Sequence, residues 1–210
     1  MRKKERLLAV REIFESLYPD VKCSLNYTTP VEMLIATQMS AQCTDANVNR
    51  VTESLFKKYT SVEDFANADL TELQEDIRSI GLYKNKSKNI ILTCQKLISD
   101  FNGKVPDTMD ELLTLPGVGR KTANLVLGDI YKKPAVVVDT HCMRVSKRIG
   151  LTNEETPEKI EYDLKRLVPP DYQLRLCHQL VYHGRALCTA RSPKCENCPV
   201  LPACKYGSGK

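Results

Sequence analysis

The 210-residue sequence has no apolar run long enough to cross a bilayer, which takes about 20 consecutive apolar residues. Its first residues lack the uninterrupted apolar core of a signal peptide and the serine content of a transit peptide. The N-terminal segment is therefore expected to begin a helix. The chain is expected to be cytoplasmic, with no membrane partner.

Alternation of apolar and polar residues with period two is nearly absent, which argues against β-sheet. Only 134–139 resembles a strand, and it could equally be an extended connector. No linker rich in glycine, serine or proline divides the chain, and no exposed apolar stripe is evident, so we expect an all-α monomer. Capping residues predict helix starts at Thr29, Asp45, Asp69, Thr108 and Thr156.

The formal net charge is +5 and the sequence pI is about 8.7. A mildly basic protein can bind nucleic acid, but this balance alone does not require it.

The nine cysteines fall into two groups. Their odd number and the lack of an export signal argue against a disulfide framework. Five are scattered and are expected to be small buried residues: Cys23, Cys43, Cys94, Cys142 and Cys177.

The other four cysteines have the spacing C-x6-C-x2-C-x5-C, at Cys188, Cys195, Cys198 and Cys204. Four thiolates in one short loop predict a metal site, and both zinc and [4Fe–4S] take four cysteines. The wide outer gaps favour the larger cluster. Arg191 and Lys194, inside the loop, would be held outward and could contact phosphate.

A helix, a glycine turn and a second helix are predicted within residues 112–128. The first helix ends near Leu113, Pro116 prevents its continuation, and the second begins at about Arg120. Gly117 and Gly119 leave backbone N–H groups unshielded at a positive helix end, which suits a phosphate and reads no base. The alternative is an ordinary turn between two helices.

Lys121 is a candidate nucleophile in the first turn of this second helix. A core stripe is expected at Ala123, Val126, Leu127 and Ile130, with Lys121 opposite it beside Leu125 and Gly128. A lysine must be neutral to attack, and its reference pKa is about 10.4. The helix N-terminus, neighbouring Arg120 and partial desolvation would all favour the neutral amine. The alternative is a solvated lysine that binds phosphate.

Asp139 is a candidate acid–base group at the end of the apolar run 135–138. Aspartate is also a favoured helix N-cap, and one carboxylate can cap and catalyse. The helix after it carries Arg144, Lys147 and Arg148 on a basic face.

Taken together, these residues resemble the endonuclease III family of helix-hairpin-helix DNA glycosylases. The similarity covers the whole chain and is carried by residues 34–45, 80–83, 112–128 and 138–141 and by the cysteine spacing. It implies a Schiff-base nucleophile at Lys121 and an essential carboxylate at Asp139. It also implies that Gln42 and Leu82 enter the duplex where the damaged base is flipped out.

The resemblance implies further assignments. The four clustered cysteines would hold a [4Fe–4S] cluster. The expected DNA-contacting residues are Gln42, Leu82, Leu115, Gly117, Val118, Gly119, Arg120, His141, Arg144, Arg191 and Lys194. The implied fold is a six-helix barrel domain with the hairpin, residues 22–132, packed against a helical iron–sulfur domain from residues 1–21 and 133–210. One departure is Cys43, where relatives often carry alanine.

The implied activity is bifunctional, on duplex DNA in the nucleoid. The enzyme would remove oxidised pyrimidines and cut the abasic strand by β-elimination. Two alternatives remain: a monofunctional adenine-type glycosylase, which lacks this lysine, and a non-catalytic DNA-binding module.

Overall fold

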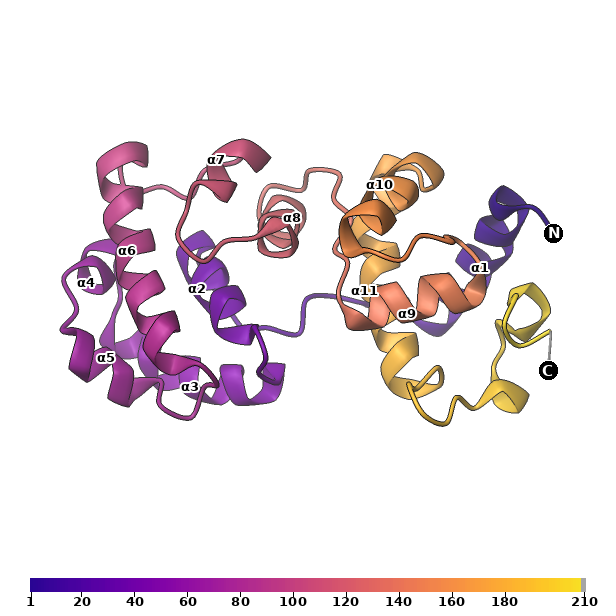
Figure 1. Cartoon of the computed structure of the whole chain (residues 1–210), viewed down its shortest axis with the longest axis horizontal. Helices are drawn as coiled ribbons and strands as arrows, with labels where there is room; N and C mark the ends of the chain where they lie inside the picture. Colours follow the sequence, from indigo (N-terminus) through magenta and orange to yellow (C-terminus); the bar gives the residue numbers. More distant parts are fainter. Residues whose placement is uncertain (209–210) are drawn as a thin grey trace. The chain divides into compact units, whose positions relative to one another are not determined.

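A computed structural model describes residues 1–208, which form two compact units. Residues 23–131 make the hairpin unit, and residues 1–22 with 132–208 make the cysteine unit. Within residues 1–208 the only regular elements are helices, so the predicted all-α class is confirmed (Figure 1). The strand-like run 134–139 is an extended connector that leads into a helix.

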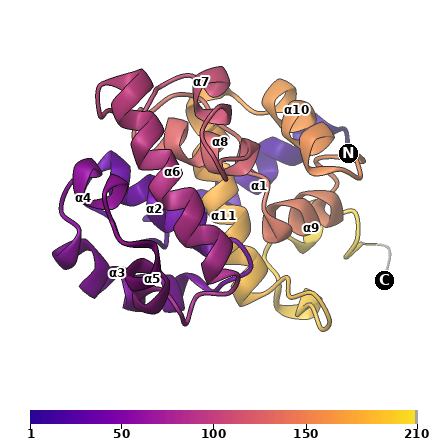
Figure 2. The same cartoon turned by 60° about the vertical axis from the view of Figure 1, so that its left-hand side comes forward.

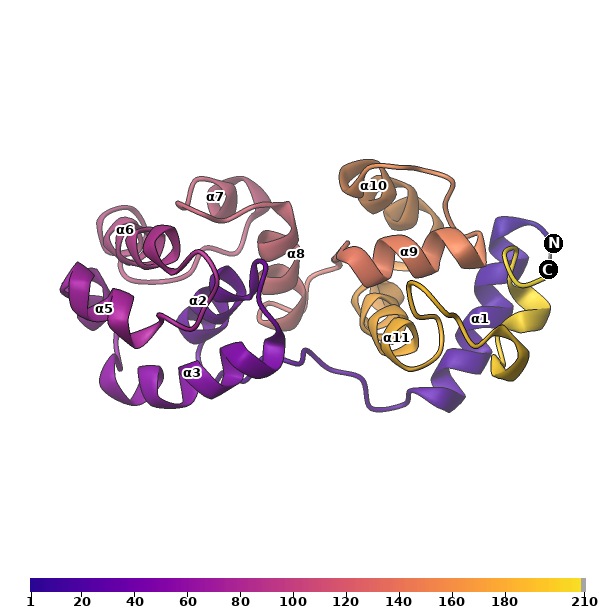
Figure 3. The same ribbon diagram turned by 60° about the horizontal axis from the view of Figure 1, so that its bottom comes forward.

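The hairpin unit is built around one buried helix. Its helices are α2 (Pro30–Ser40), α3 (Asp45–Lys58), α4 (Val62–Ala66), α5 (Leu70–Asp76), α6 (Tyr83–Phe101), α7 (Met109–Leu113) and α8 (Arg120–Asp129). Helix α2 packs against α3, α6 and α8 (Figures 1 and 3). Helices α4 and α5 pack against α6, and α7 packs against α8.

Helix α2 begins at a capping box and then runs through the core. Thr29 accepts the N–H of Glu32, whose carboxylate accepts the N–H of Thr29 in return, and Pro30 occupies the first turn. All seven residues from Met33 to Met39 are buried. A helix buried on every side contacts neighbours all round, which explains its central place in the unit.

Helix α8 differs from its prediction. Ala123 and Val126 are buried as expected, but so is every residue from Thr122 to Gly128. The middle of the helix is therefore enclosed rather than striped, and only its two ends, with Lys121 and Asp129, reach the surface.

The cysteine unit joins both ends of the chain. Its elements are α1 (Lys3–Leu17), α9 (Thr140–Ile149), α10 (Pro157–Leu167), η1 (Pro170–Tyr172), α11 (Gln173–Ala186), η2 (Cys195–Asn197) and η3 (Leu201–Ala203). Helices α9 and α11 pack together, and α1 contacts η3 (Figures 2 and 3). Arg175 of α11 binds Glu15 of α1 through two hydrogen bonds, of 2.7 and 2.8 Å. Arg6 of α1 donates to the carbonyl of Ala203 at 2.8 Å, so α1 supports the last cysteines of the loop.

One helix start differs from its prediction. Helix α3 is capped by Thr44 and not by Asp45, which is its first residue. Of the scattered cysteines, Cys94, Cys142 and Cys177 are buried as expected, whereas Cys23 and Cys43 are partly exposed. No helix in the described part of the chain is long and apolar enough to cross a membrane.

Candidate functional site

The turn between α7 and α8 is fixed in the core by its apolar residues. Leu115 and Val118 are buried, and the Val118 N–H donates to the Leu115 carbonyl at 3.1 Å. Gly117 has φ +72°, and a Cβ there would lie 2.7 Å from Nδ2 of Asn89. A side chain at 117 would be strained and would clash. Leu115 and Val118, which the sequence predicts at the DNA, thus have buried side chains that anchor the hairpin.

A polar pair beneath the turn was not predicted from the sequence. Gln38 Nε2 and Thr93 Oγ1 donate to the carbonyl of Pro116 at 2.9 and 2.8 Å. They hold the turn against α2 and α6. A glutamine inside the apolar segment 33–39 was the one available indication.

The N-terminus of α8 is open on its outer side. Helices α2, α3, α4, α5, α7, α9 and α10 each begin at a Ser, Thr or Asp whose side chain accepts a first-turn N–H. Helix α8 begins instead at Gly119, and no side chain within residues 1–208 caps it. A Cβ on Gly119 would meet no atom of those residues within 4 Å. The backbone N–H groups of this turn therefore face space in which an anion can bind.

Lys121 lies in this first turn with its side chain exposed. The sequence predicts an apolar wall beside its amine, but Leu125 and Gly128 are buried in the core and do not cover the amine. Lys121 therefore lies at the positive end of α8, next to Arg120.

Gln42 and Leu82 occupy two exposed loop tips of the hairpin unit. Gln42, after α2, has φ +54°, and Leu82, before α6, has φ +60°. This region is sparsely populated by residues with a side chain, so both tips need support from their surroundings. Leu82 is 55% exposed, which is unusual for a leucine held in so restricted a conformation.

Asp139 caps α9, as one of its two readings predicted. Its carboxylate accepts the N–H of Cys142 at 2.7 Å, and its side chain remains half-buried. Burial lowers the pKa of His141, in the same turn, so the imidazole favours its neutral form. Nδ1 of His141 accepts a hydrogen bond from Arg144 Nη2 at 3.1 Å.

The basic face of α9 serves the cysteine loop. Arg144 donates to the carbonyl of Cys188 through Nε and Nη2, at 3.2 and 3.1 Å, and to that of Gly184. Arg148 donates to the carbonyls of Thr189 and Ala190. The guanidinium groups of Arg144 and Arg148 thus hold the start of the cysteine loop; the predicted contact of Arg144 with DNA stays a prediction.

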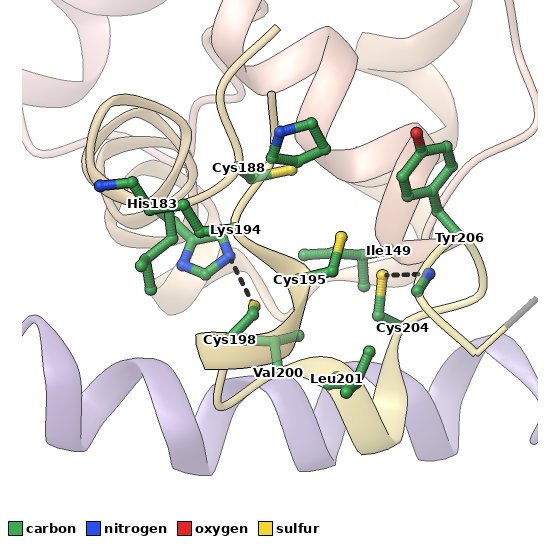
Figure 4. A pocket seen from close by; sticks show the side chains of 13 residues that line it. Ile149, His183, Cys188, Lys194, Cys195, Cys198, Val200, Leu201, Cys204 and Tyr206 are labelled. Atoms are coloured by element: carbon green, nitrogen blue, oxygen red, sulfur yellow. Dashed lines mark hydrogen bonds between the residues drawn. The ribbon is translucent and has the colours of Figure 1, made fainter. Parts of the chain in front are cut away.

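The four clustered cysteines line one cavity (Figure 4). Its wall also includes Ile149, His183 and Leu201. Within the described residues no three His, Cys, Asp or Glu side chains converge closely enough to hold a single metal ion. Four thiols spaced around a wider cavity fit a polynuclear cluster better than one zinc ion.

Hydrogen-bond donors surround the sulfur atoms, as thiolate ligands require. Arg148 Nη1 lies 3.6 Å from Sγ of Cys188, and the Gly207 N–H donates to Sγ of Cys204 at 3.4 Å. His183 Nε2 lies 3.4 Å from Sγ of Cys198 (Figure 4). Such donors stabilise thiolates bound to iron. Arg191 and Lys194 lie in the same loop and are exposed, as predicted.

The chain matches two known families. Residues 35–170 match the HhH-GPD superfamily of base excision DNA repair proteins, and residues 188–204 match the iron–sulfur binding domain of endonuclease III. Endonuclease III of Synechocystis sp. is 48% identical over 96% of this chain and 93% of its own length. Endonuclease III of Escherichia coli is 37% identical over 98% of this chain and 97% of its own.

Solved structures give the same result. A trapped covalent intermediate of endonuclease III with DNA superposes with a TM-score of 0.94 at 43% identity, covering 100% of this chain and 99% of the other. A thermostable thymine-DNA glycosylase superposes with a TM-score of 0.86 at 25% identity, covering 99% and 98%. On sequence, fold and cysteine loop, the chain belongs to the endonuclease III family of the HhH-GPD superfamily.

Proposed function

We propose that this protein is a bifunctional DNA glycosylase and abasic-site lyase of base excision repair, with oxidised pyrimidines in duplex DNA as its substrates. The observation that carries the proposal is the placement of Lys121. Its exposed amine lies in the first turn of α8, at a helix end that no side chain in residues 1–208 caps. A phosphate bound at that end would hold a nearby sugar within reach of the amine.

The chemistry needs one amine and one carboxylate. Lys121 attacks C1′ of the damaged nucleotide, and the glycosidic bond breaks as the base leaves with the electron pair and takes up a proton. The sugar ring then opens: the C1′–O4′ bond breaks, O4′ takes up a proton that the bound amine releases, and the nitrogen lone pair forms an iminium at C1′. This iminium makes the C2′ proton acidic. Its removal drives β-elimination, which expels the 3′ phosphate and cuts the strand. Asp139 is the group proposed to take part in these proton transfers, while its second oxygen is free to keep α9 capped.

Two surfaces of the protein are proposed to bind the phosphate backbone of the DNA. At the hairpin, the N–H groups around Gly117 and Gly119 bind a phosphate together with Arg120. In the cysteine loop, Arg191 and Lys194 bind another. Arg144 contributes indirectly, by holding the Cys188 carbonyl, and His141 lies beside the DNA. Gln42 and Leu82 fill and wedge the duplex where the base has left the stack.

The protein carries a [4Fe–4S] cluster, and its ligands are proposed to be Cys188, Cys195, Cys198 and Cys204. The cluster supplies rigidity to a loop that has little regular structure of its own, because η2 and η3 span only three residues each. We further propose that the enzyme is a monomer and associates with the nucleoid.

Incubation with a duplex that holds one oxidised pyrimidine tests this function. Base release together with strand cleavage 3′ to the lesion is the expected result. Base release without cleavage would indicate the monofunctional alternative, with water as nucleophile. Binding to the duplex without base release from any oxidised pyrimidine would indicate the non-catalytic module.

A further inference from the structure

A buried lysine holds the loop that carries Gln42. Lys86 of α6 is only 6% exposed, and its Nζ donates to the carbonyls of Met39, at 2.8 Å, and Ala41. These two carbonyls lie at the C-terminal end of α2. The carbonyl groups of a last helical turn lack intrahelical N–H donors, and the helix dipole is negative there. Desolvation lowers the pKa of Lys86, so its burial needs these two acceptors in return.

An asparagine holds the loop that carries Leu82. Asn47, in the first turn of α3, donates from Nδ2 to the carbonyl of Ser79 at 2.9 Å. Arg50 of the same helix donates to Oγ of Ser79 at 3.1 Å and to Oδ1 of Asn47 at 2.8 Å. Two side chains of α3 thus fix the segment just before Leu82.

The two attachments are reciprocal. The helix that follows Gln42 holds the backbone before Leu82, and the helix that follows Leu82 holds the backbone before Gln42. The tips also lie close together, because a Cβ added to Gly81 would lie 3.2 Å from the carbonyl oxygen of Gln42. Neither tip can move without straining the hydrogen bonds that hold the other.

We infer that Asn47 and Lys86 are positioning residues, which form a cross-brace that sets Gln42 and Leu82 for entry into the duplex before DNA binds. The inference rests on the proposed function. Opening the base stack costs free energy. Tips that are already held in their left-handed conformations lose less conformational entropy on insertion, which leaves more binding free energy for opening the stack. The brace should therefore matter for opening paired DNA and much less for the reaction at the sugar.

Three variants separate these roles. Lys86→Met removes the donor with little change in length, and Asn47→Asp replaces the donor to Ser79 with an acceptor of the same shape. Asn47 is the third residue of α3, where an acidic side chain suits the helix, so Asn47→Asp is expected to fold. Lys88→Met is the matched control, because Lys88 is an exposed lysine on the same helix and its substitution removes the same charge.

Each protein, with its cluster, is mixed in excess with two DNAs that contain the same oxidised pyrimidine. In one the lesion is paired, and in the other it lies in an unpaired bubble. Single-turnover base release is followed on both. On the paired DNA, the fluorescence of 2-aminopurine opposite the lesion reports unstacking independently of chemistry. Thermal melting reports folding.

For Lys86→Met and Asn47→Asp we expect base release from the paired lesion to slow by about tenfold or more, since a buried donor is lost at the step that opens the stack. The rise in 2-aminopurine fluorescence should slow equally, whereas release from the bubble should stay within about twofold of the Lys88→Met control. Equal losses on both DNAs, or an unchanged fluorescence rise, would overturn the cross-brace. If the unmodified protein and Lys88→Met act on neither DNA, the proposed function itself fails and the inference falls with it.

Discussion

The two glycines of the hairpin are expected to respond oppositely to a small side chain. Gly119→Ser adds a hydroxyl at the N-cap of α8, in the open space where no atom of residues 1–208 lies within 4 Å of a Cβ. The hydroxyl can cap the helix as Thr29, Thr44 and Thr108 cap theirs. The free energy of unfolding should hold or rise slightly, because serine is a better N-cap than glycine.

The same hydroxyl should weaken DNA binding. It takes up an N–H that is otherwise offered to phosphate and fills part of the space in front of the turn. Loss of one such charge-assisted hydrogen bond, about 1 kcal/mol or somewhat more, raises Kd about fivefold to tenfold.

Gly117→Ala should instead lower stability. The added methyl would be forced to φ +72° and to 2.7 Å from Asn89 Nδ2. Left-handed strain with this clash costs about 2 kcal/mol, or roughly 4–8 °C in Tm for a chain of this size. Fluorescence anisotropy and thermal melting of the two variants provide the test. Wild-type affinity in a Gly119→Ser protein of unchanged Tm would refute the phosphate site at this turn.

Three further changes follow from the same structure. Asp139→Asn keeps a capping oxygen, so the free energy of unfolding should change by less than about 0.5 kcal/mol. Single-turnover base release should fall about 100-fold. A large loss of Tm with activity retained would show that Asp139 only caps the helix. Cys198→Ser should lose iron and the visible absorption of the cluster, and a colourless, fully active variant would contradict the proposed ligand set. Arg191→Ala should keep that absorption but lower the slope of log Kd against log salt by about 1, and an unchanged slope would remove Arg191 from the DNA surface.

Local chemistry in the sequence predicted much of the fold. Capping at Thr29, Thr108 and Asp139 depends on residues a few positions apart, and the structure contains all three caps. The hairpin turn was likewise predictable, because proline and glycine restrict the backbone where they stand.

Contacts between distant segments could not be predicted in this way. Lys86 and Gln38 donate to the backbone carbonyls of Met39 and Pro116, and any residue supplies a carbonyl, so no pattern marks the partner. The enclosure of α8 had the same cause. Helix α8 is buried because it packs against α2 and α7. The pattern of apolar residues within 120–129 does not predict these neighbours.

The most direct test of the central claim is covalent trapping. The protein is mixed with duplex DNA carrying an oxidised pyrimidine, and borohydride is added to reduce any imine. A covalent protein–DNA complex is expected, absent in Lys121→Gln and retained in Lys104→Gln, the exposed control lysine of the same unit. A complex that persists in Lys121→Gln, or free base released with no complex at all, would contradict a Schiff base at Lys121.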